Sequence, residues 1–430
     1  SLGGYLPARQ ADFEPLDVPA LEKFDAQLKS SGKREISSTM AFVRLLSTLV
    51  KDKNMGGRVV PIVPDEARTF GMEGMFRQLG IYSSQGQRYT PHDADQIMYY
   101  KEDKKGQVLE EGINEDGSMA AWMAAATSYS TNNFPLIPFY IFYSMFGFQR
   151  VGDLCWLAGD IQAKGFLIGG TAGRTTLNGE GLQHQDGHSL ILANTIPNCL
   201  SYDPTYAYEM AVIVHEGMRR MYENQEGVFY YITAMNENYT HPAMPEGSEE
   251  GIIKGLYKLK AGGKHKVKAQ LIGSGTILRE VEAAAEMLEK DWNVSANVWS
   301  ATSVNELVRE GMDVDRYNRL HPTAEKKRSY ISECMDDQDG VVVASTDYMR
   351  LYAEQLRPWI KQRYVVLGTD GFGRSDTRER LRSFFEVDRY HVVVATLSAL
   401  ADEGTIKYDV VAKAIKQYKI DADATNPVKV

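Results

Sequence analysis

Four side chains that commonly carry acid-base chemistry or bind metals stand close together in the segment GEGLQHQDGHS at 179–189. They are Glu180, His184, Asp186 and His188. Imidazole and carboxylate groups four residues apart can share a helix face and bind zinc, but the glycines in this segment argue against a helix and no third clear ligand is present. A loop histidine that acts on a substrate is the better functional interpretation. A surface loop with hydrogen-bonded imidazoles is the structural alternative.

Three further acids stand next to expected helices or strands. Glu115, in the segment EGINEDGSMAAWM at 111–123, directly precedes a helix of small and apolar residues. A carboxylate at this position is commonly only a helix cap, which the helix dipole favours. Asp65 and Glu66 follow an apolar strand, at the end where open α/β sheets bind ligands. Their structural alternative is an ion pair with Arg68.

Two glycine-rich turns do not meet the requirements of nucleotide-binding loops. In GGTAGRTTLNGEG, Arg174 stands where a phosphate-binding P-loop needs lysine, and Ile168 stands where it needs its first glycine. In LIGSGTIL, Leu278 replaces the third glycine of a dinucleotide-binding fingerprint. The chain also contains no Gly-x-Ser-x-Gly or His-Glu-x-x-His motif. The sequence therefore does not favour a P-loop NTPase, a nicotinamide-dependent enzyme or a hydrolase with a catalytic triad.

Helices and strands must hold the candidate residues in position. The sequence predicts that helical and extended segments alternate along the chain. Helical spacing after a Ser/Thr cap predicts a helix at 38–52, and an apolar run predicts a strand at 58–67. Because the strands are continuous apolar runs between amphipathic helices, we expect parallel sheets covered on both faces. Further helices are expected at 119–130, 152–165, 206–224, 276–291, 304–312 and 347–360, and further strands at 136–144, 166–173, 227–235, 267–275, 296–303, 340–346 and 364–371.

A segment rich in proline, glycine and charge at 236–262 interrupts this alternation. The length of 430 residues also exceeds what a single hydrophobic core normally organises. We therefore expect an α/β protein with two successive parallel-sheet domains, at 1–244, including an N-terminal linker segment, and at 245–430.

Composition and charge narrow the class of protein. Hydrophobic residues make up 43% and charged residues 24%, as in ordinary globular proteins. The net charge of −9 is spread along the chain, so we expect no nucleic-acid partner. Cys155, Cys199 and Cys334 are far apart and suit reduced thiols. No apolar run approaches the roughly 20 residues of a membrane helix, and residues 1–10 lack the features of a signal peptide. We expect a cytoplasmic protein with no membrane segment.

Six stretches of the chain are similar to one enzyme family. They are DEARTFGMEG, EGINE, STNNFPLIPFYIFYSMFGFQR, GTAGRTTLNGEGLQHQDGHS, ASTDYM and GTDGFGRSD. Through them the chain resembles the decarboxylating, first component of the bacterial homodimeric pyruvate dehydrogenase complex, in its middle and C-terminal domains only. The resemblance implies a pyrimidine-binding middle domain at 1–244 and a transketolase-like C-terminal domain at 245–430.

The resemblance also implies a reaction, cofactors and partners. Family members are oxidoreductases that use thiamine diphosphate and Mg2+ to decarboxylate pyruvate, and they pass the acetyl group to the lipoyl disulfide of dihydrolipoyl acetyltransferase. The family's diphosphate motif begins with Gly-Asp-Gly, which does not occur in this sequence. The magnesium ligands are therefore expected outside this chain. The implied partners are a second copy in a homodimer, an N-terminal diphosphate-binding domain on another polypeptide, and the lipoyl domain.

Three residues of this chain match the family's aminopyrimidine site. Glu115 matches the carboxylate that hydrogen-bonds a ring nitrogen of the aminopyrimidine and favours its imino tautomer. Phe146 matches the ring that packs on the aminopyrimidine face. Tyr143 matches a residue close to the same ring and to the substrate. The resemblance thus selects two rings from an aromatic segment whose composition alone predicts a buried strand.

Other matched residues belong to the substrate side of the family site. His184 matches a histidine near the substrate or its intermediates, and Asp65 and Glu66 match acids at the mouth of the active centre. Arg150 and His188 also match family positions, but no chemical step is assigned to them.

Two alternatives stay open on the sequence. One is a related thiamine enzyme, such as a transketolase or a 2-oxoglutarate dehydrogenase. The other is a non-catalytic dimerisation fragment. The absence of a Gly-Asp-Gly motif from the sequence is consistent with this alternative. Glu115, Phe146 and His184 together argue against the second alternative, because a scaffold does not need them.

Overall fold

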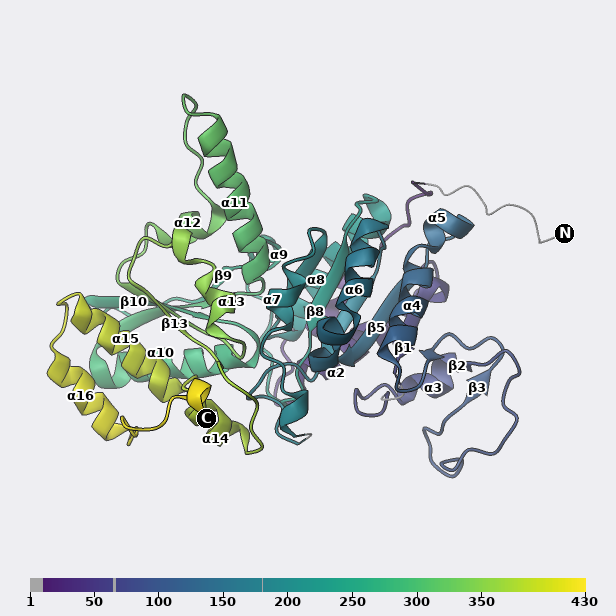
Figure 1. The fold of residues 1–430 in the computed structure, drawn as a ribbon, viewed down its shortest axis with the longest axis horizontal. Helices are drawn as coiled ribbons and strands as arrows, with labels where there is room; N and C mark the ends of the chain where they lie inside the picture. Colours follow the sequence, from purple (N-terminus) through teal and green to yellow (C-terminus); the bar gives the residue numbers. More distant parts are fainter. Residues whose placement is uncertain (1–10, 65–66, 180) are drawn as a thin grey trace. The chain divides into compact units, whose positions relative to one another are not determined.

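The computed structural model describes residues 11–64, 67–179 and 181–430. They form two compact units (Figure 1). The first unit contains the described residues of Ser1–Thr171, with Leu192–Leu200 and Met210–Ala243. The second contains those of Ala172–Ile191, Ser201–Glu209 and Met244–Val430. Two short stretches that precede residue 244 therefore pack with the second unit, and the boundary of the folding domains at 244/245 stays a prediction.

A six-stranded sheet forms the centre of the first unit. Its strands are β1 (Val59–Val63), β4 (Leu109–Glu110), β5 (Ile137–Tyr143), β6 (Phe166–Gly170), β7 (Cys199–Tyr202) and β8 (Phe229–Thr233). Their order is β4-β1-β5-β6-β8-β7, and the pairings of β1 with β4 and β5, and of β6 with β5 and β8, are parallel. β6 and β8 are buried along their whole length, as their continuous apolar sequences predict.

Helices connect these strands, as the alternation predicts. α4 packs against β1 and β5 and beside α6. α2 begins after Ser37, whose hydroxyl accepts the N–H of Met40. The helices are α1 (Asp25–Leu28), α2 (Ser38–Leu49), α3 (Gly74–Leu79), α4 (Glu115–Ala126), α5 (Ser128–Asn132), α6 (Gly147–Asp160), α7 (Ser189–Ala193) and α8 (Ala207–Met218). The two-residue strands β2 (Ile81–Tyr82) and β3 (Glu102–Asp103) pair separately.

The second unit has a five-stranded sheet. Its strands are β9 (Tyr257–Lys260), β10 (Val267–Gly273), β11 (Val294–Ser300), β12 (Val341–Ser345) and β13 (Tyr364–Leu367), in the order β13-β12-β10-β11-β9. β10 to β13 pair in parallel, whereas β9 is an antiparallel edge strand beside β11. The exposed lysines Lys258 and Lys260 protect this edge from pairing with other chains.

The helices of the second unit differ from the sequence expectation in two places. α11 extends to Leu320, and Figure 1 shows it projecting away from the sheet of its unit. The single helix expected at 347–360 is wrong, because Arg357–Trp359 is a separate 3-10 turn around Pro358. The helices are α9 (Glu249–Lys254), α10 (Leu278–Trp292), α11 (Val304–Leu320), α12 (Tyr330–Met335), α13 (Arg350–Glu354), α14 (Arg378–Phe384), α15 (Arg389–Asp402) and α16 (Tyr408–Gln417).

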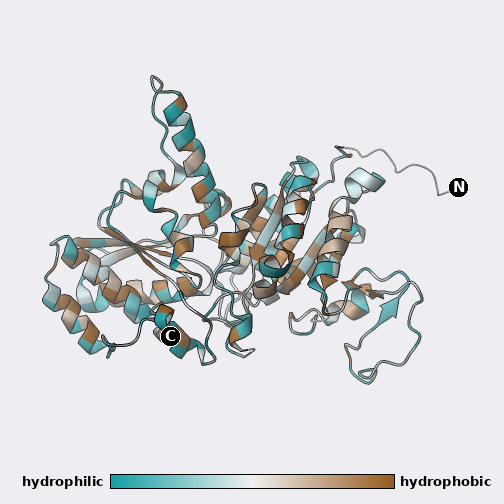
Figure 2. Cartoon of the chain, viewed as in Figure 1, coloured by the Kyte–Doolittle hydropathy of each residue, from teal (hydrophilic) through white to brown (hydrophobic). Residues whose placement is uncertain are grey.

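Hydropathy follows this architecture. In Figure 2 the strands of both sheets carry brown, apolar residues, whereas helices such as α16 carry brown and teal residues together. That mixture is expected of helices with one face on a core and one face in water. Across the described residues, no helix has both the length and the apolar character that a membrane crossing requires.

Candidate active site

Glu115 is the first residue of α4, but it is not the cap of that helix. The cap is Asn114, whose side-chain oxygen accepts the N–H of Gly117 at 3.0 Å. The Glu115 side chain is only 14% exposed, and its Oε1 accepts a hydrogen bond from Nη1 of Arg150 at 2.8 Å. Since the side chain of Asn114 accepts the backbone N–H at the start of α4, a capping role does not explain the position of the Glu115 carboxylate.

The aromatic segment divides at the end of β5. Tyr143 is the last residue of the strand, and Phe146 closes the 3-10 turn Ser144–Phe146 that leads directly into α6. Gly147 allows this tight junction, because a Cβ at that position would lie 2.2 Å from a ring atom of Phe142. The rings of Tyr143 and Phe146 meet edge to face, with centroids 6.1 Å apart.

Arg150 joins the carboxylate to the aromatic pair. Its guanidinium carbon lies 4.3 Å from the centroid of the Phe146 ring, and the same guanidinium donates to Glu115. Glu115, Tyr143, Phe146 and Arg150 therefore form one group in the first unit, which we call the Glu115 cluster. It lies at the carboxyl end of β5, the end of a parallel strand where open α/β sheets bind ligands.

His184 lies in the second unit, in the 3-10 turn Leu182–His184, and it is partly exposed. The next residue, Gln185, holds this turn in place: its side-chain amide donates to the carbonyl of Arg374 and accepts the N–H of the same residue, both at 2.8 Å. A partly exposed imidazole on a turn that is held in place is suited to meet a substrate. The structure thus brings Glu115, Tyr143 and Phe146 together, whereas His184 belongs to the other unit.

The neighbouring residues of His184 have structural roles. The Asp186 carboxylate is buried and accepts the backbone N–H groups of His188 and Ser189, each at 2.9 Å. It therefore caps the start of α7. The Nδ1 atom of His188 lies 3.9 Å from the nearer Asp186 oxygen. Across residues 11–64, 67–179 and 181–430 no group of three or more His, Cys, Asp or Glu side chains is arranged to hold a metal ion, and Glu180 lies outside the described residues.

The glycine-rich loop after β6 already holds an anion from its own chain. The buried carboxylate of Asp347 accepts the backbone N–H of Thr175 at 2.8 Å and that of Thr176 at 3.1 Å. It also accepts both threonine hydroxyls, at 2.7 and 2.6 Å. Burial raises the pKa of Asp347, while these hydrogen bonds and the charge of Arg382 act in the opposite sense. The N–H groups that would cradle a phosphate thus bind an internal carboxylate.

Arg174, which stands where a P-loop has lysine, is buried within the second unit. Its Nη1 donates to the backbone carbonyls of Thr369 and Gly371, the latter at 2.6 Å. Burial lowers the pKa of the Arg174 guanidinium. The side chain thus binds the loop at 368–376 through its carbonyls, which agrees with the sequence argument against an NTPase.

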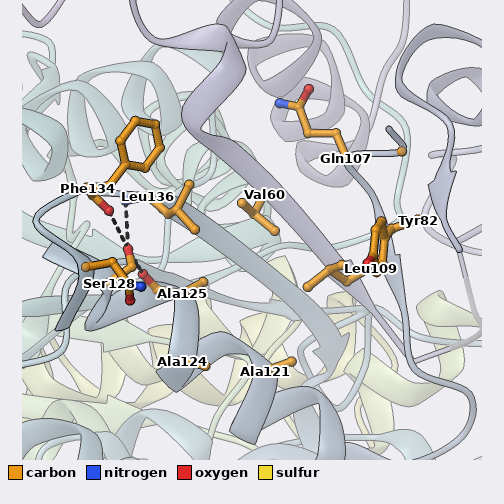
Figure 3. Close-up of a pocket in the computed structure, with 12 residues that line it drawn as sticks. Val60, Tyr82, Gln107, Leu109, Ala121, Ala124, Ala125, Ser128, Phe134 and Leu136 are labelled. Atoms are coloured by element: carbon orange, nitrogen blue, oxygen red, sulfur yellow. Dashed lines mark hydrogen bonds between the residues drawn. The ribbon is translucent and has the colours of Figure 1, made fainter. Parts of the chain in front are cut away.

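An apolar pocket of about 750 Å³ lies elsewhere in the first unit (Figure 3). Its lining includes Ala121 and Ala124 of α4, Val60 of β1 and Leu109 of β4, and none of the Glu115 cluster. Ser128 lines it too, but its hydroxyl donates to the carbonyls of Ala125 and Phe134 within the chain. Gln107 also lines the pocket, and its side-chain amide donates to the carbonyls of Gly56 and Val59, so the polar groups of Ser128 and Gln107 are bonded within the chain.

The two acids predicted at the mouth of the site, Asp65 and Glu66, lie outside the described residues. Among the described residues, Arg68 forms an ion pair with Asp93 and donates to the carbonyl of Met98 at 3.1 Å. The roles of Asp65 and Glu66 therefore stay predictions.

Comparison with known proteins assigns the family. The family model described as the pyruvate dehydrogenase E1 component middle domain matches residues 16–242, more than half of the chain. The chain belongs to the pyruvate dehydrogenase E1 family. A second model, the transketolase-like TK C-terminal domain, matches residues 255–388. The resemblance to the middle and C-terminal domains of this family is thereby confirmed.

Curated relatives share the E1 description. The chain is 65% identical over 430 residues to the pyruvate dehydrogenase E1 component of Pseudomonas aeruginosa, covering 100% of this chain and 49% of that protein. It is 62% identical over 429 residues to the E1 component of Escherichia coli K12, covering 99% of this chain and 48% of that protein. The chain spans about half the length of the curated relatives it matches.

Solved structures confirm the α/β fold of this E1 chain. Transketolase from Leishmania mexicana matches with a TM-score of 0.64 at 16% identity, over 87% of this chain and 47% of that chain. A structure described as a split gene transketolase, inactive beta4 tetramer, matches with a TM-score of 0.54 at 16% identity, over 85% of this chain and 98% of that one. At these identities the likeness concerns the fold alone.

Sequence reasoning did not assign a contact to Arg150, although one signal was available. Phe146 and Arg150 are four residues apart at the start of a helix, and side chains at that spacing lie on the same face. The partner Glu115 could not be found in this way, because 35 residues separate it from Arg150. Only the packing of α4 beside α6 in the E1 fold brings the two together.

Proposed function

We propose that this chain is the middle and C-terminal part of a thiamine-diphosphate-dependent pyruvate dehydrogenase, the decarboxylating enzyme of a pyruvate dehydrogenase complex. The Glu115 cluster carries the proposal: a mostly buried carboxylate and an aromatic ring contact the same arginine at the carboxyl end of β5, in a chain of the E1 family. A carboxylate acceptor and a ring face are what an aminopyrimidine requires, so the residues present fit this part of the cofactor.

Each residue of this half-site has a task that follows from its chemistry. Thiamine diphosphate, when bound, supplies the carbanion chemistry that removes carbon dioxide from a 2-oxo acid. With the cofactor bound, the Glu115 carboxylate would accept a hydrogen bond from a pyrimidine ring nitrogen and would favour the tautomer that can take up a proton. Phe146 packs on the ring face and excludes water from it. Tyr143, edge-on to Phe146, lines the side from which substrate approaches.

His184, Asp65 and Glu66 serve the substrate side in this proposal. The ring nitrogens of an imidazole can donate or accept a hydrogen bond, which suits His184 to contact the oxygen atoms of a 2-oxo acid. Its partial exposure and fixed loop support this assignment. Asp65 and Glu66 are proposed as acids at the entrance to the site.

A complete site needs groups that this chain lacks. The sequence contains no Gly-Asp-Gly, so the diphosphate and Mg2+ are assigned to an N-terminal domain, which we propose is carried by another polypeptide. The active assembly is then a homodimer of such halves, which passes acetyl groups to the lipoyl domain of dihydrolipoyl acetyltransferase. Cys155, Cys199 and Cys334 carry thiol groups, which suit the reducing, cytoplasmic location that we propose.

Substrate preference tests the proposal. The chain is combined with an N-terminal polypeptide that contains the Gly-Asp-Gly motif, and decarboxylation is followed with an artificial electron acceptor. We expect pyruvate to be consumed far faster than 2-oxoglutarate or a ketose phosphate. The reverse order would assign the chain to a different thiamine enzyme, such as a 2-oxoglutarate dehydrogenase or a transketolase.

A further inference from the structure

Phe372 is the most exposed large apolar side chain among the described residues, at 81%. It lies in the loop after β13, between Gly371 and Gly373. Leu182 and Val428 are also exposed, at 50% and 58%. All three apolar residues belong to the second unit. Single exposed apolar residues are common on protein surfaces, whereas a group of them marks a binding surface more often.

The loop after β13 packs against the turn Leu182–His184. The side chain of Gln185 joins the two segments through its hydrogen bonds with the backbone of Arg374, both at 2.8 Å. A Cβ at Gly373 would lie 2.5 Å from the carbonyl oxygen of Leu182, so the two backbones approach as closely as only glycine allows. The exposed ring in this loop therefore adjoins the turn that carries the proposed substrate-side histidine.

The same loop also contacts the segment that carries Val428. Gly371 has a φ of 108°, and a Cβ at this position would lie 2.7 Å from the carbonyl oxygen of Pro427. Backbone contacts thus hold the loop on both sides of Phe372, while the ring itself is exposed to solvent. We call the three exposed side chains, Leu182, Phe372 and Val428, the Phe372 patch.

A lipoyl group combines a reactive disulfide with an apolar chain. The disulfide closes a small ring, and methylene groups join this ring to an amide on a lysine of the lipoyl domain. In the proposed reaction, pyruvate and a proton give carbon dioxide, an acetyl group on one sulfur and a hydrogen on the other, while the S–S bond breaks. Methylene groups gain free energy when they leave water for an apolar surface. The Phe372 patch offers such a surface beside the turn of His184.

We propose that the Phe372 patch binds the apolar arm of the lipoyl group and so guides its disulfide toward His184. The ring of Phe372 supplies the main contact, because large aromatic side chains dominate most binding surfaces. This inference rests on the proposed function. It adds to that function the surface by which the second unit recognises the acetyl acceptor.

The test compares two acceptors with the enzyme assembled from this chain and an N-terminal polypeptide that contains Gly-Asp-Gly. One acceptor is an isolated lipoyl domain, and the other is the artificial electron acceptor, which has no lipoyl arm. Phe372→Ser is expected to raise the KM for the lipoyl domain about tenfold, as for the loss of one central aromatic contact. The ratio of kcat/KM for the lipoyl domain to that for the artificial acceptor falls by the same factor. Phe372→Leu, which keeps an apolar side chain, is expected to recover most of the loss.

Met312 provides a matched control in the same unit. It lies on α11, and its side chain is 60% exposed. Met312→Ser therefore removes an exposed apolar side chain without changing the Phe372 patch. We expect it to leave the KM for the lipoyl domain within twofold of that of the unsubstituted enzyme.

A competitor separates binding of the arm from binding of the protein surface around it. A lipoyl domain that carries an octanoyl group on its lysine keeps the apolar chain but has no disulfide to react. We expect it to inhibit acetyl transfer, and Phe372→Ser to raise its inhibition constant about tenfold. Equal inhibition by the octanoylated and the unmodified domain would overturn the inference, because the enzyme would then recognise the domain and not its arm.

Three further outcomes would also overturn it. The first is an unchanged KM for the lipoyl domain in Phe372→Ser, and the second is an equal loss with both acceptors. The third is dissociation of the assembled enzyme by Phe372→Ser in analytical ultracentrifugation, since the patch would then be covered by another polypeptide or by a second copy of this chain. If the unsubstituted assembly does not decarboxylate pyruvate with the artificial acceptor, the proposed function itself fails.

Discussion

Glu115 and Asp116 are adjacent acids in the first turn of α4, and they provide a comparison at the scale of single residues. Glu115 is mostly buried and bonded to Arg150, whereas Asp116 is exposed. Both feel the same helix dipole. A difference in turnover between Glu115→Gln and Asp116→Asn therefore reports the catalytic contribution of the Glu115 carboxylate rather than a change in the stability of the helix.

Glu115→Gln is expected to lower turnover of the assembled enzyme by about 100-fold or more, the usual contribution of a group that controls proton transfer. The turnover of Asp116→Asn is expected to stay within twofold of that of the unsubstituted enzyme. The measurement is the rate with pyruvate at saturating thiamine diphosphate. Unchanged turnover in Glu115→Gln would favour the alternative that this chain is a non-catalytic dimerisation fragment.

At the residue scale, only part of this arrangement can be predicted from the sequence. Composition predicted a buried strand at 136–144, and β5 is that strand. Nothing in the spacing of its many aromatic residues distinguishes Tyr143 or Phe146, and the family resemblance alone selected them. The junction with α6 depends on Gly147 fitting against Phe142, a contact that a pattern of residue types does not contain.

At the scale of elements, Asp347 holds the loop after β6 to the loop after β12. Four donors of Thr175 and Thr176 converge on its carboxylate. The sequence alone argues against a phosphate-binding loop at this position. It does not identify Asp347 as the partner of the loop, because 171 residues separate Thr176 from Asp347. The same limit applies to Ala172–Ile191, whose packing with the second unit no local periodicity indicates.

Asp347→Ala is expected to lower the free energy of unfolding by about 3 kcal/mol, because it leaves buried donors without their acceptor. Asp337, whose side chain is 78% exposed, is the matched control in the same unit. Asp337→Ala should change stability by less than about 0.5 kcal/mol. Urea unfolding of the two variants makes the comparison, and equal midpoints would show that the loop does not depend on Asp347.

Elements were predicted best where their hydrophobic pattern was long. The alternation of helices and strands correctly predicted an α/β fold with two main sheets. It did not predict β9, which lies in the segment at 236–262 interpreted as an interruption, because four residues with two lysines carry no clear strand pattern. It also extended a helix across Pro358, although proline removes a backbone donor and commonly ends a helix.

At the scale of the whole molecule, the proposed site needs a diphosphate-binding motif that does not occur in residues 1–430. The chain alone is expected to bind thiamine diphosphate weakly and to show no turnover, since it lacks the diphosphate motif. Addition of an N-terminal polypeptide containing Gly-Asp-Gly should restore both. A denaturing mass spectrum of the purified assembly checks the composition, and full activity in a sample containing this chain alone would contradict the division of the site.

The internal carboxylate in the glycine-rich loop suggests a chemical rescue. If Asp347 is replaced by glycine, the two N–H groups and two hydroxyls that bound it would surround a space of carboxylate size. Backbone N–H groups gathered in this way attract small anions. Added formate should then restore stability to Asp347→Gly while leaving the unsubstituted chain unaffected, so that a soluble carboxylate replaces one that the chain normally supplies itself.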